Sequence, residues 1–231
     1  LNPDISYSFF PKSRIINRHG PKLEYELRWN ETLGTTDRDF SAGYEVRFQS
    51  LAQLTLSQKN KYVYLFNDFD PTRTGGEKLN AGTSYYNNTV ELRFQSNPRK
   101  AFNVNLRSEF GEYFTGNIAS FRGEMGIRMG YKANISMNFS YNKIELPEPQ
   151  NDAELFLIGP RIDITFTKSL FWTTFIQYNN QIDNLNINTR VQWRFAPVSD
   201  FFVVYTDNYF PGDFLPKQRS LVLKLNYWLN L

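Results

Sequence analysis

Charged side chains recur at every second residue in many segments of this sequence, and this spacing predicts one shared chemical role. Alternate residues of a β-strand point to the same face, so such charges would line one surface. Rings of charged side chains inside a membrane pore select the solutes that pass. The alternative is that the charges pair across strands and brace a narrow barrel. The predicted lumen-facing positions are Arg47, Arg107, Glu109, Glu124, Arg128, Arg161, Asp163, Arg190, Arg194 and Lys224.

Patterns for catalysis and metal binding are weak. A hydrolase needs a nucleophile, a base and an orienting group, but the only histidine, His19, has no recognisable serine or aspartate spacing and lies in a predicted basic loop. Gly-rich phosphate loops and metal-ligand spacings are missing. Two pairs of loop acids could transfer protons or bind Ca²⁺, although solvated charge is the commoner role at loop tips: Glu145/Glu148 and Asp68/Asp70. We therefore expect no enzymatic activity, no metal site and no cofactor.

A further group of candidate ligand contacts is aromatic. Tyr205, Tyr209, Phe210 and Phe214 lie in or beside a predicted long loop, residues 208–218. Aromatic rings at the external mouth of a pore could stack on sugar rings. An aromatic girdle at the membrane interface is the commoner explanation for such residues.

Strict alternation of apolar and polar residues predicts strands along almost the whole chain. Phe102 and Val104, for example, would face one side of a strand, and Asn103 and Asn105 the other. The predicted strands cover about residues 5–9, 22–33, 40–48, 54–66, 83–96, 102–109, 118–130, 134–142, 156–167, 170–180, 185–195, 200–209 and 219–231. The last of them would run to the final residue and close the sheet.

The two-faced strands favour an all-β fold, an antiparallel transmembrane β-barrel of about 12–14 strands. Aromatic residues make up 17% of the chain, yet its mean hydropathy is −0.51, which is typical of a lipid-facing exterior around a polar lumen. No apolar run is long enough for a transmembrane helix. Predicted short turns alternate with longer loops, as in outer-membrane barrels. A soluble β-sandwich is the alternative, but its wide aromatic faces would promote aggregation in water.

Charge and cysteine content exclude other classes. The net charge is +3 with acids and bases interspersed, so no basic stripe indicates a nucleic-acid partner. Cysteine is absent, which excludes disulfides and thiolate metal sites. The sequence shows no secretory signal at its start, so we expect any signal to lie outside this chain or to have been removed.

Four segments of the sequence carry a resemblance: Phe110–Gly116, Leu170–Asn180, Asn186–Trp193 and Pro197–Tyr205. They resemble an uncharacterised outer-membrane family of the Bacteroidota. Its members join an N-terminal carbohydrate-binding domain, similar to module family nine, to a C-terminal β-barrel. The resemblance implies that residues 1–231 form a single barrel domain from the C-terminal portion of a longer protein. It transfers no catalytic motif.

These observations together predict a non-enzymatic outer-membrane protein of a Gram-negative bacterium. We expect it to take part in the passage or surface handling of glycans or small solutes, or to belong to a larger envelope complex. Its expected partners are membrane lipid, envelope lipoproteins or other outer-membrane proteins, and a glycan. Two other hypotheses remain: a plugged barrel that anchors a partner or an extra domain, and a membrane-embedded hydrolase.

Overall fold

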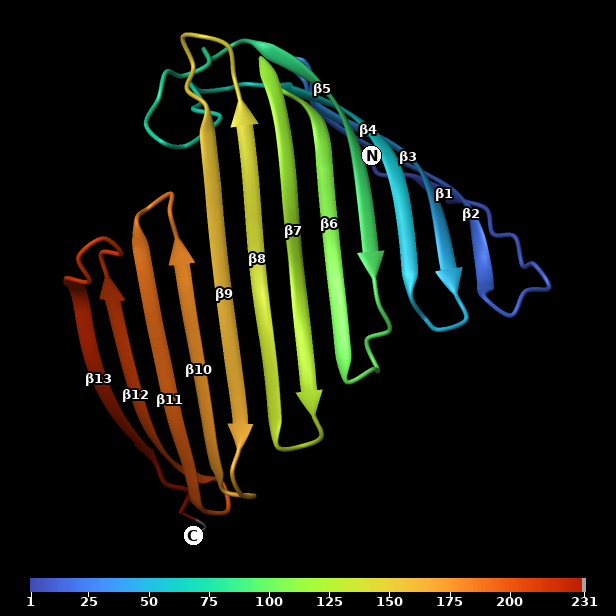
Figure 1. Ribbon diagram of the computed structural model, residues 1–231. Helices are drawn as coiled ribbons and strands as arrows, with labels where there is room; N and C mark the ends of the chain where they lie inside the picture. The colour runs from blue at the N-terminus through green and yellow to red at the C-terminus, as the bar shows by residue number, and fades with distance from the viewer. Residues whose placement is uncertain (230–231) are drawn as a thin grey trace. The chain divides into compact units, whose positions relative to one another are not determined.

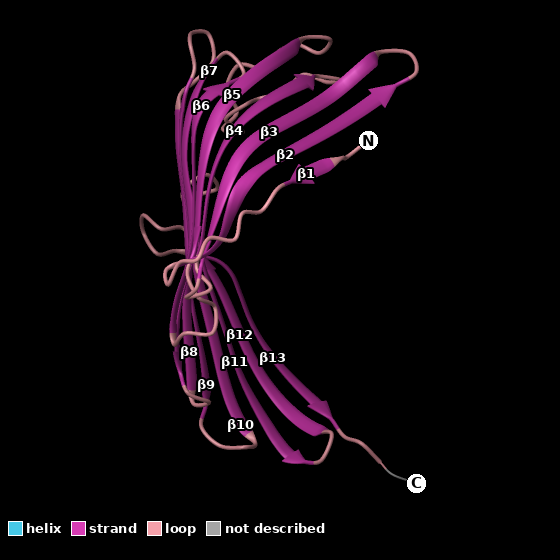
Figure 2. Ribbon diagram, turned by 90° about the vertical axis from the view of Figure 1, so that its right-hand side faces the viewer, coloured by secondary structure: helices cyan, strands magenta, loops and turns pink. Residues whose placement is uncertain are grey.

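A computed structural model describes residues 1–229 as antiparallel strands joined by turns and loops (Figure 2). Thirteen strands form one sheet, and each strand pairs with its neighbours in the sequence. No helix within the described residues could cross a membrane. The strands (Figure 1) are β1 (Asp4–Ser6), β2 (Ile16–Asn30), β3 (Gly34–Phe48), β4 (Gln53–Tyr64), β5 (Ser84–Gln95), β6 (Phe102–Tyr113), β7 (Gly116–Met129), β8 (Ala133–Glu145), β9 (Ala153–Thr165), β10 (Leu170–Asn179), β11 (Asn184–Ala196), β12 (Ser199–Tyr209) and β13 (Pro216–Asn226).

The strand order has two ends, so the sheet is open as described. β1 pairs only with β2, and β13 pairs only with β12. The prediction of an all-β antiparallel fold with about thirteen strands is therefore confirmed. Closure into a barrel is not part of the described pairing.

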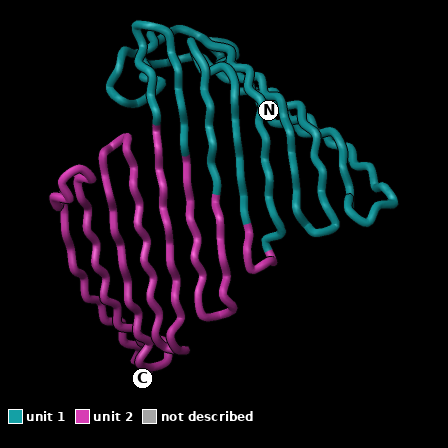
Figure 3. The backbone as a smooth tube through the Cα atoms, viewed as in Figure 1, with its two compact units in different colours: residues 1–98, 104–123, 141–154 teal, residues 99–103, 124–140, 155–231 magenta. Residues whose placement is uncertain are grey.

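The chain forms two compact units (Figure 3). Unit 1 comprises residues 1–98, 104–123 and 141–154. Unit 2 comprises residues 99–103, 124–140 and 155–231, of which the last two lie outside the described residues. Strands β6 to β9 contribute residues to both units.

The sheet buries polar side chains and exposes apolar ones, which inverts the usual arrangement of a soluble protein. Strand β5 shows this most clearly. On one face Thr89 and Glu91 are 7% and 1% exposed, whereas on the other face Val90 and Leu92 are 47% and 43% exposed. We call these the polar face and the apolar face. Phe102 and Leu223, which the sequence places on the apolar face, are also exposed.

Only a few apolar side chains are buried among the described residues, and they cluster around two loops of unit 1. Leu65 and Leu79 lie at the ends of the loop between β4 and β5, where Phe69 and Leu79 form an isolated bridge. The other three lie at the end of β8, in the loop that follows it and at the start of β9: Ile144, Leu146 and Ala153. These two small apolar groups stabilise the loops rather than the sheet.

Several predicted boundaries are wrong. The basic loop predicted around His19 is largely strand, because β2 begins at Ile16. The sequence pattern predicts a break between the strands at 22–33 and 40–48, but β3 already begins at Gly34 and the turn lies at 31–33. The closing strand ends at Asn226 instead of reaching Leu231; residues 230 and 231 of that prediction lie outside the described residues.

Candidate functional site

A polar cavity of about 950 Å³ lies in unit 1, on the polar face of the sheet. Strands β2 to β7 supply most of its walls, and the remaining lining residues are Asn2 and Asp4 near the N-terminus and Phe69, Arg73 and Phe114 from two loops. The lining carries charges of both signs, and its cations include Lys59, Arg93 and Arg107. A cavity of this volume is within the range of small-molecule sites.

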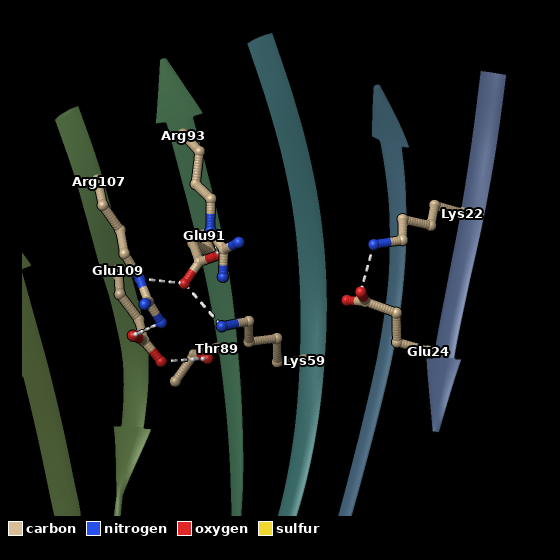
Figure 4. Close-up of polar contacts among 8 residues, drawn as sticks. All are labelled: Lys22, Glu24, Lys59, Thr89, Glu91, Arg93, Arg107 and Glu109. Atoms are coloured by element: carbon tan, nitrogen blue, oxygen red, sulfur yellow. Dashed lines mark hydrogen bonds and ion pairs between the residues drawn. The ribbon is translucent and has the colours of Figure 1, made fainter. Parts of the chain in front are cut away.

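Glu91 organises the charges beside this cavity (Figure 4). Its carboxylate is almost fully buried and binds three cations from three neighbouring strands. Glu91 Oε2 accepts from Lys59 Nζ at 2.6 Å and lies 2.5 Å from Arg107 Nε, while Arg93 Nε binds Oε1. A buried charge is tolerated only when it is paired in this way.

The strand register explains why these residues meet. Directly opposite positions carry like charges, since Glu91 faces Glu109 and Arg93 faces Arg107. Like charges in this position repel, but the diagonal pair of Glu91 and Arg107 is attractive. Arg107 Nη2 also approaches Glu109 Oε2 at 3.5 Å, so its guanidinium lies between the two carboxylates.

A second ion pair lies on β2, away from the Glu91 group (Figure 4). Lys22 Nζ binds Glu24 on the same strand, and both residues line the cavity. Each side chain is more than a third exposed, so the pair is weaker than the contacts of Glu91.

The loop between β4 and β5 is ordered by Asp70. Its carboxylate accepts hydrogen bonds from Thr72 Oγ1 at 2.7 Å and from the backbone N–H of Gly75 at 2.8 Å. Tyr113 donates its hydroxyl to the carbonyl of Pro71 at 3.1 Å, which ties the loop to the end of β6. These contacts hold the part of the loop that lines the cavity.

Desolvation raises the pKa of Asp70, but the hydrogen bonds to its carboxylate outweigh this effect. The Thr72 hydroxyl and backbone N–H groups, including that of Gly75, stabilise the ionised form. The net result lowers the pKa from 3.8 to about 2. Asp70 is therefore a structural anion of the loop, and the predicted acid/base or Ca²⁺ role of the Asp68/Asp70 pair gains no support from this geometry.

The predicted lumen-facing residues are divided between the units. Arg107 and Glu109 line the cavity of unit 1, and Arg47, also in unit 1, donates to Gln53 Oε1 at 2.9 Å. In unit 2, two local ion pairs form, Arg161–Asp163 at 2.9 Å and Arg194–Asp200 at 3.3 Å. The remaining predicted positions are also in unit 2, without a contact that unites them into a site: Glu124, Arg128, Arg190 and Lys224.

Two of the four aromatic candidates make polar contacts of their own in unit 2. The hydroxyls of Tyr205 and Tyr209 both donate to Asp207 Oδ2, at 2.5 and 2.6 Å. Arg219 Nε donates to the same oxygen at 2.7 Å, and the Asp207 carboxylate is fully buried. Lys217 Nζ lies 4.2 Å from the centre of the Phe210 ring. Phe214 is 65% exposed.

The candidates for catalysis are not assembled into a site. His19 Nδ1 lies 2.5 Å from the Tyr44 hydroxyl, and its ring stacks on Phe9. Glu145 pairs with Lys143 at 2.6 Å. Within residues 1–229, no group of three His, Cys, Asp or Glu side chains could hold a metal ion.

Sequence reasoning missed Glu91 and two of the three cations that it binds beside the cavity. Glu91, Lys59 and Arg93 were absent from the predicted lumen positions, although all three occupy alternate positions that the pattern assigns to the polar face. The signal was therefore present for the face. The sequence pattern did not identify the contacts of Glu91, because alternation does not reveal which residues of neighbouring strands lie opposite each other.

Comparisons with known proteins add no relative. No family model matches the chain, and no curated protein or solved structure matches it either.

Replacement of Glu91 tests its role as the central counter-charge. We expect Glu91→Gln to lower the free energy of unfolding by about 3–5 kcal/mol, because three cations lose a buried partner. The matched control is Glu109→Gln, whose partly exposed carboxylate contributes about 1 kcal/mol or less. Denaturant unfolding of the refolded protein in detergent micelles measures both. Equal effects of the two substitutions would contradict the central role of Glu91.

The loop between β4 and β5 should respond to acid. Because the folded-state pKa of Asp70 is about 2, below its ordinary 3.8, its stabilising effect is complete above 3.8 and is lost as the pH falls through about 2. The amide proton resonances of Gly75 and Gly76 should follow this titration in NMR spectra. Asp70→Asn should remove it. A midpoint at 3.8 in the unsubstituted protein would show that the carboxylate does not order the loop.

Proposed function

We propose that this chain is the membrane-embedded part of an outer-membrane β-barrel that is not an enzyme and lets small polar solutes pass or be held at the cell surface. The observation that carries the proposal is the inverted burial of the sheet. On β5, buried Asn87, Thr89 and Glu91 alternate with exposed residues, of which Tyr86, Val90 and Leu92 are apolar or aromatic. An apolar exterior around a polar interior is the arrangement of transmembrane barrels.

The dimensions of the strands support the same proposal. Apart from the short β1, the strands contain 10 to 15 residues. A tilted membrane-spanning strand needs about 9–11 residues, whereas strands of soluble proteins have about five or six. Each unit therefore has strands long enough to cross a bilayer.

The apolar face supports a lipid environment. Large apolar side chains are exposed in both units, for example Leu56, Tyr86 and Leu92 in unit 1 and Val191, Trp193 and Leu223 in unit 2. In water such surfaces promote association. In a bilayer, they would contact acyl chains, with aromatic residues at the interfaces.

The barrel proposal requires the edge strands β1 and β13 to be paired, because unpaired backbone groups are not tolerated in hydrocarbon. Glycans are the proposed class of solute, and this part of the proposal follows from the sequence resemblance alone.

A filled barrel that anchors a partner is the second candidate. One observation favours it: the loop between β4 and β5 is fixed by Asp70 and by buried Thr72 and Leu79, and Phe69 and Arg73 from it line the cavity. A fixed loop of this kind can block a lumen. Conduction distinguishes the two candidates.

The lipid exposure of the apolar face is tested by a charge placed near the middle of β11. Val191 is 39% exposed on the apolar face, whereas its neighbour Gln192 donates to Asp200 on the polar face. In lipid vesicles, Val191→Arg should cost about 2–4 kcal/mol of folding free energy. Gln192→Arg, the control, should cost far less. If the apolar face contacts water, Val191→Arg will change stability by no more than about 0.5 kcal/mol.

Passage through the interior is tested by electrical recording. The purified chain, added to planar lipid bilayers, should produce discrete conductance steps that grow with salt concentration. Deletion of residues 67–82, which shortens the loop between β4 and β5, should increase the step size. Stable insertion without conductance, in both the intact and the shortened chain, would refute the pore and support the anchor.

A further inference from the structure

We propose that Lys59, Arg93 and Arg107 form a binding site for an oxyanion, the phosphate, sulfate or carboxylate group of a small solute. We call these three residues the cation cluster. They line the cavity of unit 1 and converge on the single carboxylate of Glu91. The inference rests on this cavity and holds whether or not the barrel conducts.

The charges of the cluster are not balanced. Three cations share Glu91, and within the described residues the only other carboxylate that forms an ion pair with them is that of Glu109. The group of five therefore carries one excess positive charge. An anion in the cavity would neutralise it.

The negative charge is covered, whereas the positive charges are accessible. Glu91 is 1% exposed, but the side chains of Arg93 and Arg107 are 53% and 39% exposed. A solute in the cavity would therefore meet guanidinium groups before it met the carboxylate that holds them. This arrangement favours an anionic ligand over a cationic one.

Donor capacity points to the same ligand class. A guanidinium has five N–H donors and an ammonium has three, so the cluster has more donors than the two oxygens of Glu91 can accept. Arg93 and Arg107 bind Glu91 through Nε, the atom on the inner edge of the guanidinium. The planar ends of such groups match the oxygen spacing of phosphate, sulfate and carboxylate.

The acidic residues of the cavity come largely from other strands. Of the six acidic residues that line the cavity, Asp4, Glu24, Glu26 and Asp39 are on β1 to β3, whereas Glu109 and Glu112 are on β6 with Arg107. Lys22, the cation nearest to these acids in sequence, is paired with Glu24 (Figure 4). Strands β4 to β6 contribute four cations to the lining, Lys59, Lys61, Arg93 and Arg107, against the carboxylates of Glu109 and Glu112. The positive end of the cavity is therefore there, and the oxyanion would bind there.

Isothermal titration of the full chain in a non-ionic detergent tests the proposal. Inorganic phosphate and sulfate should bind, and binding should weaken as sodium chloride is added. Glucose 6-phosphate and glucose distinguish a free oxyanion from one carried by a sugar. Tighter binding of glucose 6-phosphate than of phosphate, with none for glucose, would assign the site to a sugar-borne anion.

Substitution locates the site. Arg93→Gln should weaken phosphate binding at least about tenfold, since a charge-assisted contact is lost. Lys22→Gln, in the same cavity but paired with Glu24, should change the affinity less than about twofold. Circular dichroism and the unfolding midpoint of each variant confirm that it folds. The proposal is overturned if neither anion binds, or if both variants bind as the unsubstituted chain does.

Discussion

The architecture of unit 1 depends on the neutralisation of one buried carboxylate. Glu91 lies at the middle of three paired strands and holds a cation from each of them. Without those cations the carboxylate would have to leave the polar face or take up a proton, because an unpaired charge is costly out of water. The same contacts keep Arg93 and Arg107, which lie directly opposite each other, from separating β5 and β6. The register of β4 to β6 brings these charges together, and their pairing sets the charge beside the cavity.

The free energy that maintains the sheet does not come from a large apolar core. Only five apolar side chains are buried among the described residues, and they belong to loops and strand ends of unit 1. Backbone hydrogen bonds along the strands and polar contacts between alternate side chains hold the remainder together. In water, the folding of such a sheet would gain little hydrophobic free energy, because its large apolar side chains stay exposed. The proposed bilayer would supply the missing apolar environment and would do so for both units.

Much of the fold was predictable because alternation is a local property. Each strand carries its two faces in its own sequence, so the thirteen segments and the sides of Phe102 and Leu223 could be inferred. The boundaries of β2 were missed because Gly20 and Pro21 normally disfavour strands; they are tolerated here beside the irregular edge segment 1–9. The Glu91 group was missed for another reason. Its contacts depend on which residues lie opposite each other, and that information is in the pairing of strands, not in any one of them.

The contact between Asp207 and Arg219 has a consequence for biogenesis. The two residues lie opposite each other on β12 and β13, and the carboxylate also accepts the hydroxyls of Tyr205 and Tyr209. Their neighbours on the same face are largely apolar, including Leu221 and Leu223. If that face enters hydrocarbon, a separate β12 would carry a bare anion and a separate β13 a bare cation. The two strands would therefore have to form a hairpin before insertion, so that Asp207 and Arg219 enter the lipid as an ion pair without net charge.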